Sequence, residues 1–386
     1  MRIESCALKI VADENIPGLD GLAAAGIRLS RIPGRDIGAA DIRDADALLI
    51  RSVTRVNASL LDGATRLRFL GTATSGFDHV DRALLQRRGI AFAHAPGSNA
   101  NSVVEYVLSA IAESADFLER LFAGARVGIV GYGHIGQRLG QRLDALGIAW
   151  NVSDPWLDLS DVAQAAPLSR VLSADVVTLH AELTDLPPYP SRHLLHARNL
   201  NLLSDQALLI NASRGALVDN VALRHRLNVA GAPLAVLDVW EGEPFIDTDL
   251  LARARFGSAH IAGYSWDGKF LATRMLFAEM AEALSIAPPP VASEAPPALT
   301  FHGAGEVGAA LVRSLLAARY RLADDDRQLR EAMDTAVSAE SRGESFDELR
   351  RGYRMRRELA GSVVINSRWG PEQCALAQAL GVTVNC

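Results

Sequence analysis

Short apolar runs separated by helix-like stretches characterise the first 95 residues of the chain. The runs that this pattern predicts to be strands are followed by polar or glycine-containing turns and lie at 8–12, 47–50, 67–71 and 90–93. Parallel strands need a crossover connection, which is usually a helix. Strands that alternate with helices therefore predict a parallel sheet.

A second series of the same kind follows a long helical pattern over 101–122. Its strands are predicted within 125–133 and at 149–153, 176–180, 207–211, 234–239 and 258–261. Another helix is expected from Trp266 to about residue 286. In a layout of two facing α/β domains, such a late helix can cross back onto the first domain. We therefore expect the first domain to be discontinuous.

A proline-rich stretch separates these two series from a third region. The prolines lie within ten residues, at 288, 289, 290, 296 and 297, and they indicate a semi-rigid linker. Beyond the linker, helices are predicted at 306–319, 346–358 and 371–380, and strands at 362–366 and 382–385. The predicted domains are 1–98 with 266–286, 99–265 and, after a linker at 287–298, 299–386.

Composition limits the possible partners. Of the 386 residues 49% are hydrophobic and 22% charged, and the net charge of -6 argues against nucleic acid or an anionic membrane. No apolar run approaches the roughly 18 residues of a membrane span, and charge comes too early for a signal peptide. Cys6, Cys374 and Cys386 form no CxxC pair, so we expect no disulfide framework, no metal site and a cytoplasmic setting.

A glycine motif follows the first strand of the second series. Gly131, Gly133 and Gly136 form the spacing GxGxxG in front of an amphipathic helix. The first glycine makes a tight turn, the second admits a pyrophosphate close to the backbone, and the third allows close helix–strand packing. The amides of His134 and Ile135 would then face the phosphates at a helix N-terminus.

An acidic residue specifies the nucleotide. Asp154 lies 18 residues beyond Gly136, at the end of the next predicted strand. There a carboxylate accepts hydrogen bonds from a ribose diol and repels a 2′-phosphate, so NAD is favoured over NADP. The alternative is a glycine turn that only packs, with Asp154 capping the next turn.

Three polar residues each follow an apolar strand, where ligands bind in open parallel sheets. His260 is suited to remove a hydroxyl proton near neutral pH, Glu243 to orient its ring, and Arg214 to hold a carboxylate. Taken singly, each is more simply a packed or surface residue; their joint pattern favours a catalytic set. Asp238 either contacts the nicotinamide side of the cofactor or caps a helix.

Three segments carry a family resemblance: IleAsnAlaSerArgGlyAlaLeuValAsp at 210–219, LeuAspValTrpGluGlyGluPro at 237–244 and HisIleAlaGlyTyr at 260–264. They resemble the D-isomer-specific 2-hydroxyacid dehydrogenases, whose Arg/Glu/His set matches the three residues above. The resemblance implies an α/β fold of two doubly wound parallel-sheet domains, a Rossmann NAD-binding domain and a discontinuous flavodoxin-like substrate domain.

Further stretches narrow the resemblance, at 11–15, 51–56, 71–81, 95–100 and 260–269. They are most similar to a branch of the family that oxidises 4-phospho-D-erythronate in pyridoxal phosphate biosynthesis. The resemblance implies that Ser52, Thr74 and Tyr264 contact the substrate and that Gly263 lies against the cofactor. It also implies a small C-terminal α+β dimerisation domain, and hence a homodimer.

Some features leave alternatives open. At Ala181 the family usually has threonine, so only a backbone contact with the cofactor is expected there. The substrate phosphate is expected to bind Arg51 or the arginines at 350, 351, 354, 356 and 357. The nearest rival function is the same chemistry on another acid such as 3-phosphoglycerate; a less favoured one is an NAD-sensing binding protein.

Overall fold

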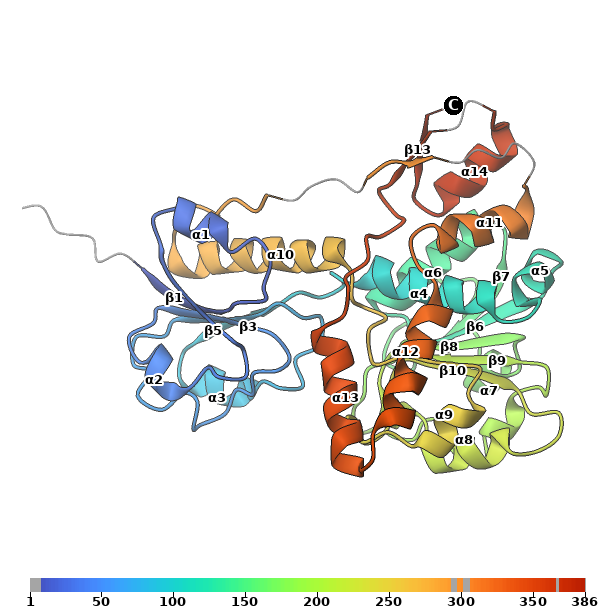
Figure 1. The fold of residues 1–386 in the computed structure, drawn as a ribbon, viewed down its shortest axis with the longest axis horizontal. Helices are drawn as coiled ribbons and strands as arrows, with labels where there is room; N and C mark the ends of the chain where they lie inside the picture. Colours follow the sequence, from blue (N-terminus) through green and yellow to red (C-terminus); the bar gives the residue numbers. More distant parts are fainter. Residues whose placement is uncertain (1–7, 293–296, 301–305, 366–367, 386) are drawn as a thin grey trace, which may run out of the picture. The chain divides into compact units, whose positions relative to one another are not determined.

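The computed structural model describes residues 8–292, 297–300, 306–365 and 368–385. The chain forms two compact units (Figure 1). The first consists of Met1–Asn99 with Ser265–Ala295, and the second of Ala100–Tyr264 with Pro296–Cys386. Among the described residues, no helix is both long enough and apolar enough to span a membrane.

The first unit is a five-stranded parallel sheet in the order β2-β1-β3-β4-β5. Its strands are β1 (Lys9–Asp13), β2 (Arg28–Ile32), β3 (Ala47–Ile50), β4 (Phe69–Thr72) and β5 (Ala91–His94). Its helices are α1 (Asp20–Ala24), α2 (Ala39–Ile42), α3 (Arg82–Arg87) and α10 (Trp266–Leu284). Apolar side chains of α1 and α10 pack on one face of the sheet, and those of α2 and α3 on the other.

The second unit contains a six-stranded parallel sheet in the order β11-β10-β9-β8-β6-β7. Its strands are β6 (Arg126–Val130), β7 (Ala149–Ser153), β8 (Val176–Leu179), β9 (Leu208–Asn211), β10 (Leu234–Leu237) and β11 (Phe256–Gly257). The helices are α4 (Ala100–Glu113), α5 (Phe117–Phe122), α6 (His134–Ala145), α7 (Leu168–Leu172), α8 (Asn220–Leu227) and α9 (Thr248–Arg253), with short 3-10 turns η1 (Leu200–Leu202) and η2 (Gly215–Leu217).

The C-terminal part of the chain belongs to the second unit. It contains a small parallel sheet in the order β12-β13-β14 and four helices. The elements are β12 (Leu299–Thr300), α11 (Gly308–Ala317), α12 (Leu322–Thr335), α13 (Ala339–Arg351), β13 (Val363–Ile365), α14 (Pro371–Ala379) and β14 (Thr383–Asn385). Leu311, Val312 and Leu315 share one hydrophobic core with Val107 and Ile111 of α4.

Several sequence-based assignments of secondary structure were wrong. The helix expected over 101–122 is two helices, α4 and α5, with Ala115 at φ 47° between them. The strand expected over 258–261 ends at Gly257, and His260 has φ 56°. The helix expected over 346–358 ends at Arg351. Strand β2 was missed because it is an edge strand: none of its side chains is fully buried, and Arg28 and Arg31 are exposed.

The cysteines also differ from expectation, because Cys374 is disulfide-bonded. Cys6 and Cys386 lie outside the described residues. Sequence spacing could not show this bond, because disulfide formation depends on the approach of Cβ atoms in the folded chain.

Candidate active site

The three glycines of the loop after β6 have different surroundings. A Cβ on Gly131, which has φ 95°, would lie 2.4 Å from the Ala181 nitrogen, and a Cβ on Gly136 would lie 2.2 Å from the Gly131 oxygen. A Cβ on Gly133 would meet nothing within 4 Å. Packing therefore requires two of the glycines, whereas the third borders open space that a pyrophosphate can approach.

Helix α6 begins at His134, so the amides of His134 and Ile135 lie in its first turn, where backbone donors have no partner within the helix. Asp154 stands beside this loop: its carboxylate accepts from the amide of Tyr132 at 2.8 Å and of Trp156 at 3.0 Å. The bond from the Trp156 amide is the contact expected if Asp154 only caps the turn after its strand. The arrangement fits a dinucleotide, and the ribose contact of Asp154 stays a prediction.

His260 and Glu243, the residues predicted to transfer the proton, lie in contact. Nδ1 of His260 lies 2.8 Å from Oε2 of Glu243, and Oε1 of Glu243 accepts from the Trp240 amide at 2.7 Å. Burial alone would raise the pKa of Glu243, but the charge and hydrogen bond of His260, the amide of Trp240 and the charge of Arg350 together lower it. The Glu243 carboxylate is therefore ionised where it contacts Nδ1 of His260.

Asp238, at the end of β10, fixes the backbone around His260. Its buried carboxylate accepts from the Ser258 hydroxyl at 2.6 Å and from the amides of Ile261 at 2.7 Å and Ala262 at 2.9 Å. Its carbonyl accepts from the His260 amide at 2.7 Å. These bonds account for the bend that replaces the predicted strand. Asp238 is therefore a positioning residue, and its contact with nicotinamide stays a prediction.

Arg214 follows β9 on a loop that comes close to the Glu243 segment. A Cβ on Gly215 would lie 2.0 Å from the carbonyl carbon of Trp240, so only glycine permits this approach. Nη1 of Arg214 donates to the Ser213 carbonyl at 2.9 Å. The Ser213 hydroxyl donates to the carbonyl of Ala181 at 2.6 Å, which leaves the amide of Ala181 as the backbone group for the cofactor contact predicted there.

The predicted substrate residues of the first unit lie near the carboxyl ends of its strands. Nε of Arg51 donates to the fully buried Asp13 carboxylate at 2.9 Å. The Thr74 hydroxyl donates to the Gly76 carbonyl at 2.7 Å, and Ser52 is exposed. Tyr264 belongs to the second unit. Arg51 and Ser52 follow β3 and Thr74 follows β4, whereas Tyr264 lies seven residues beyond β11; the substrate contacts of all four stay predictions.

Lys269, on the first turn of α10, is a site residue that the sequence did not predict. Burial, followed by the charge of Arg51, lowers its pKa from 10.5 to about 8, against the opposing effect of Asp13. Perturbed titration beside other charges is typical of functional sites. The only sequence signal was its place in the family-like segment at 260–269.

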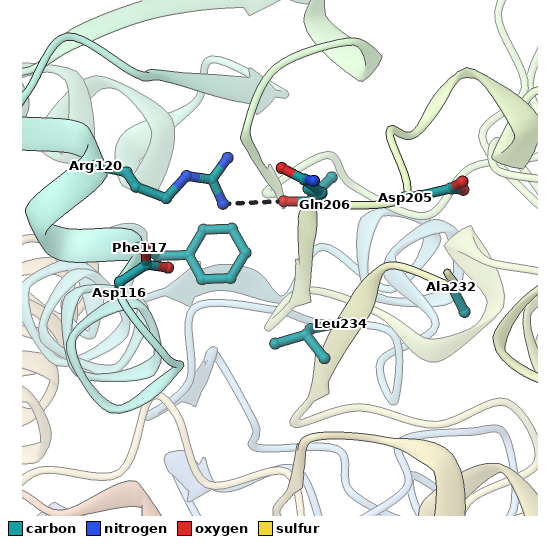
Figure 2. A pocket seen from close by; sticks show the side chains of 8 residues that line it. Asp116, Phe117, Arg120, Asp205, Gln206, Ala232 and Leu234 are labelled. Carbon is teal, nitrogen blue, oxygen red and sulfur yellow. Dashed lines mark hydrogen bonds between the residues drawn. The ribbon is translucent and has the colours of Figure 1, made fainter. Parts of the chain in front are cut away.

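A surface pocket lies at the opposite end of the second sheet (Figure 2). It is lined by Phe117, Arg120, Gln206 and Leu234 among others, near the amino ends of β9 and β10. Arg120 donates to the Gln206 carbonyl at 3.1 Å and pairs with Asp175. Because ligands of such sheets bind at the carboxyl ends of strands, this pocket is separate from the active site.

Comparison with known proteins identifies the family. Residues 99–262 match the NAD-binding domain of the D-isomer specific 2-hydroxyacid dehydrogenases, and residues 294–381 match a domain of unknown function (DUF3410). An erythronate-4-phosphate dehydrogenase of Cellvibrio japonicus is 43% identical over 91% of this chain and 93% of its own length. The chain belongs to the erythronate-4-phosphate dehydrogenase family. The predicted family, enzyme class and use of NAD are confirmed.

Other relatives extend the match. An enzyme of the same name from Proteus mirabilis is 38% identical over 97% of this chain and 98% of its own length. A solved structure from Thermus thermophilus matches with a TM-score of 0.60 at 25% identity, covering 74% of this chain and 100% of that one. A D-lactate dehydrogenase of Aquifex aeolicus has a TM-score of 0.58 at 20% identity, covering 72% and 96%. The predicted α/β fold class is confirmed.

Proposed function

We propose that this chain oxidises 4-phospho-D-erythronate at C2 to 2-oxo-3-hydroxy-4-phosphobutanoate, with NAD as oxidant, in pyridoxal 5′-phosphate biosynthesis. The named relatives at 37–43% identity support the substrate. The 2.8 Å contact between His260 and Glu243 carries the chemistry, because it gives a base whose far nitrogen is available and whose near nitrogen is oriented by a carboxylate.

The reaction removes a proton and a hydride from the same carbinol. Nε2 of His260 takes the proton of the C2 hydroxyl as the C2–H bond breaks and the C=O bond forms. NAD bound at the glycine loop would supply the hydride acceptor. Glu243 stabilises the imidazolium that results, and its carboxylate stays ionised because its pKa is lowered in this setting.

The remaining residues bind and orient. Arg214 holds the substrate carboxylate through its planar guanidinium, which fixes C2 beside His260. The dinucleotide is held by the glycines at 131, 133 and 136, the amides of His134 and Ile135, and Asp154, with further contacts from Ala181, Asp238 and Gly263. Ser52, Thr74, Tyr264 and Arg51 complete the substrate contacts.

A turnover screen with NAD tests this proposal. The ratio kcat/KM should be highest for 4-phospho-D-erythronate and much lower for D-erythronate and 3-phospho-D-glycerate. Sites that pair a polar group reject analogues lacking it by up to about 10,000-fold. If D-erythronate is used equally well, the substrate assignment is wrong and only the assignment as a 2-hydroxyacid dehydrogenase stands. If 3-phospho-D-glycerate is preferred, the enzyme is a dehydrogenase of that acid.

We also propose that the enzyme is a cytoplasmic homodimer formed through its C-terminal region. That region exposes the apolar side chains of Val307, Val337 and Ile365, and most soluble oligomers are two-fold dimers. Light scattering should give the mass of a dimer for the full chain, and charged substitutions at Val337 and Ile365 should lower it. An unchanged dimer would place the interface elsewhere, and cell fractionation tests the compartment.

A further inference from the structure

The C-terminal helices are built against the loops that carry the catalytic residues. The Asp326 carboxylate on α12 accepts from the Gly257 amide at 2.7 Å, three residues before His260. On α13, a Cβ on Gly343 would lie 2.7 Å from the ring of Phe245, two residues after Glu243. A side chain at 343 would require the exposed Phe245 ring or the helix to move.

The segment after α13 is anchored on the same loops. Arg356 is 7% exposed, and its Nη2 donates to the Ala262 carbonyl at 2.8 Å and the Ser102 carbonyl at 3.1 Å. Its guanidinium lies 4.1 Å from the ring centre of Tyr320. The ring of Tyr353 packs edge-on against Tyr264 at 5.9 Å. The last turn of α13 is thereby held next to the residues around His260.

Arg350, in that last turn, interacts with two residues of the candidate active site. It forms a side-chain hydrogen bond with Tyr264, and its charge acts on Glu243. Its Nε is buried and has no hydrogen-bond partner among the described residues. The neighbouring Arg351 and Arg354 are exposed. Arg342 and Arg356 also have a buried Nε without a partner, but only Arg350 combines this with contacts to Tyr264 and Glu243, so its Nε–H is a donor that a bound anion can use.

We propose that Arg350, with Tyr264, binds the phosphate of the substrate; this inference rests on the function proposed above. The substrate carries a carboxylate at one end and a phosphate at the other. Arg214 is assigned to the carboxylate, so the second anionic group needs another cation near His260. A guanidinium presents its Nε–H and Nη–H side by side and can bind two phosphate oxygens at once.

With Arg350 in this role, the C-terminal region takes part in recognition of the substrate phosphate. The dehydrogenase match ends at residue 262, and residues 294–381 match a domain of unknown function. At least a quarter of this chain has no counterpart in the matched Thermus thermophilus structure. The common dehydrogenase fold would supply the chemistry, and the added region would supply selectivity for a phosphorylated acid.

The test compares Arg350→Met and Arg350→Lys with Arg351→Met, a matched exposed control on the same turn. For Arg350→Met, kcat/KM for 4-phospho-D-erythronate should fall by about 10- to 100-fold, the usual effect of losing charged hydrogen bonds. The value for D-erythronate should change less than about 3-fold. Arg350→Lys should recover part of the loss, since it keeps the charge without the paired donors, and Arg351→Met should match wild type.

Inhibition by inorganic phosphate gives a second measurement, which does not require turnover of the unphosphorylated acid. Its inhibition constant should rise by a similar factor in Arg350→Met only. Equal losses on both substrates would overturn the proposal and make Arg350 a positioning residue acting through Glu243. A phosphate dependence that follows Arg51→Ala instead would also overturn it.

Two further outcomes are distinguishable. If Arg350→Met lacks the circular dichroism and Tm of a folded protein, Arg350→Lys alone decides by the same two measurements. If wild type shows no preference for 4-phospho-D-erythronate, the proposed function fails. The phosphate inhibition constants still show whether Arg350 binds the anion.

Discussion

Each unit has a carboxylate paired with a basic side chain near the carboxyl ends of its strands. In the second unit Glu243 holds His260 at 2.8 Å; in the first, Asp13 holds Arg51 at 2.9 Å. Histidine gains and loses a proton near neutral pH, whereas arginine stays charged. The same geometry therefore supports proton transfer in one unit and a permanent positive charge in the other.

The surroundings extend this contrast. Glu243 also accepts from a backbone amide, so its negative charge is held in place for the ring. Around Asp13 a second cation, Lys269, is partly buried, and Arg51 depresses its pKa further. Two cations share one buried carboxylate there, an arrangement that favours an anionic ligand at a cost in stability.

Of the changes that test this comparison, removal of the base should have the largest effect on activity. His260→Ala should lower kcat by about 100-fold or more, the usual contribution of general base catalysis. In wild type the oxidation rate should rise with pH as His260 loses its proton. In Glu243→Gln activity should fall, because the imidazolium formed during the reaction loses its carboxylate partner.

His193 offers a matched control, since its Nε2 lies 2.6 Å from Glu241 in a second histidine–glutamate pair. His193→Ala should keep the pH–rate profile of wild type. An active His260→Ala enzyme with an unchanged profile would show that the second unit does not hold the base.

Cofactor choice should depend on the second unit alone. Asp154→Ala removes the carboxylate beside the glycine loop, so the preference of kcat/KM for NAD over NADP should shrink by about 10-fold or more, as expected for a close charge facing a 2′-phosphate. Asp158→Ala, at an exposed carboxylate that makes a similar turn contact with Ser160, is the control. Wild type that uses NADP as well as NAD would contradict the role of Asp154.

A buried carboxylate should make the stability of the second unit depend on pH. Glu105 on α4 accepts from the amides of Leu359 and Ala360, and burial, with the charge of Glu358, raises its pKa from 4.5 to about 7. The folded state therefore binds this proton more tightly, and its contribution is present below pH 4.5 and lost as pH rises to 7. The loss should be roughly 2–3 kcal/mol.

Urea unfolding at pH 5 and pH 8 measures this effect. Glu105→Gln should stabilise relative to wild type more at pH 8 than at pH 5. Glu113→Gln, at another α4 carboxylate that accepts from two amides of the C-terminal segment, controls for removal of charge from the helix. If Glu105→Gln and wild type differ in free energy of unfolding by the same amount at both pH values, the raised pKa of Glu105 is not the cause of the difference.

The smallest effect is expected from Lys269 in the first unit. Its pKa is about 8 in the folded state, whereas the ordinary lysine value is 10.5. The charged amine therefore destabilises the folded state at neutral pH, and the free energy of unfolding rises between pH 8 and 10.5. Lys269→Met should stabilise by about 1–2 kcal/mol at pH 7 and less at pH 10, with a higher KM for the anionic substrate. A destabilised Lys269→Met protein would show that the amine is needed for packing.

The sequence by itself determined the family and the parallel-sheet fold, and it predicted the glycine loop and the catalytic set. The strands and the glycine loop are local features: an apolar run fixes a strand, and the glycines act within six residues of one another. The strands predicted at 47–50 and 149–153 agree with β3 and β7. For β3 the reason is that a buried parallel strand is continuously apolar.

The tertiary structure decided what depends on distant contacts. The bend at His260 exists because the Asp238 carboxylate, 22 residues earlier, binds the loop amides, so an apolar run that suggested a strand is not one. Likewise, five arginines at 350–357 were equivalent in the sequence. Only folding separated the buried Arg356, which holds the Ala262 carbonyl, and Arg350, beside Tyr264 and Glu243, from the exposed Arg351 and Arg354. The difference in burial depends on which way each side chain faces and on what packs against it, and no local sequence pattern shows either.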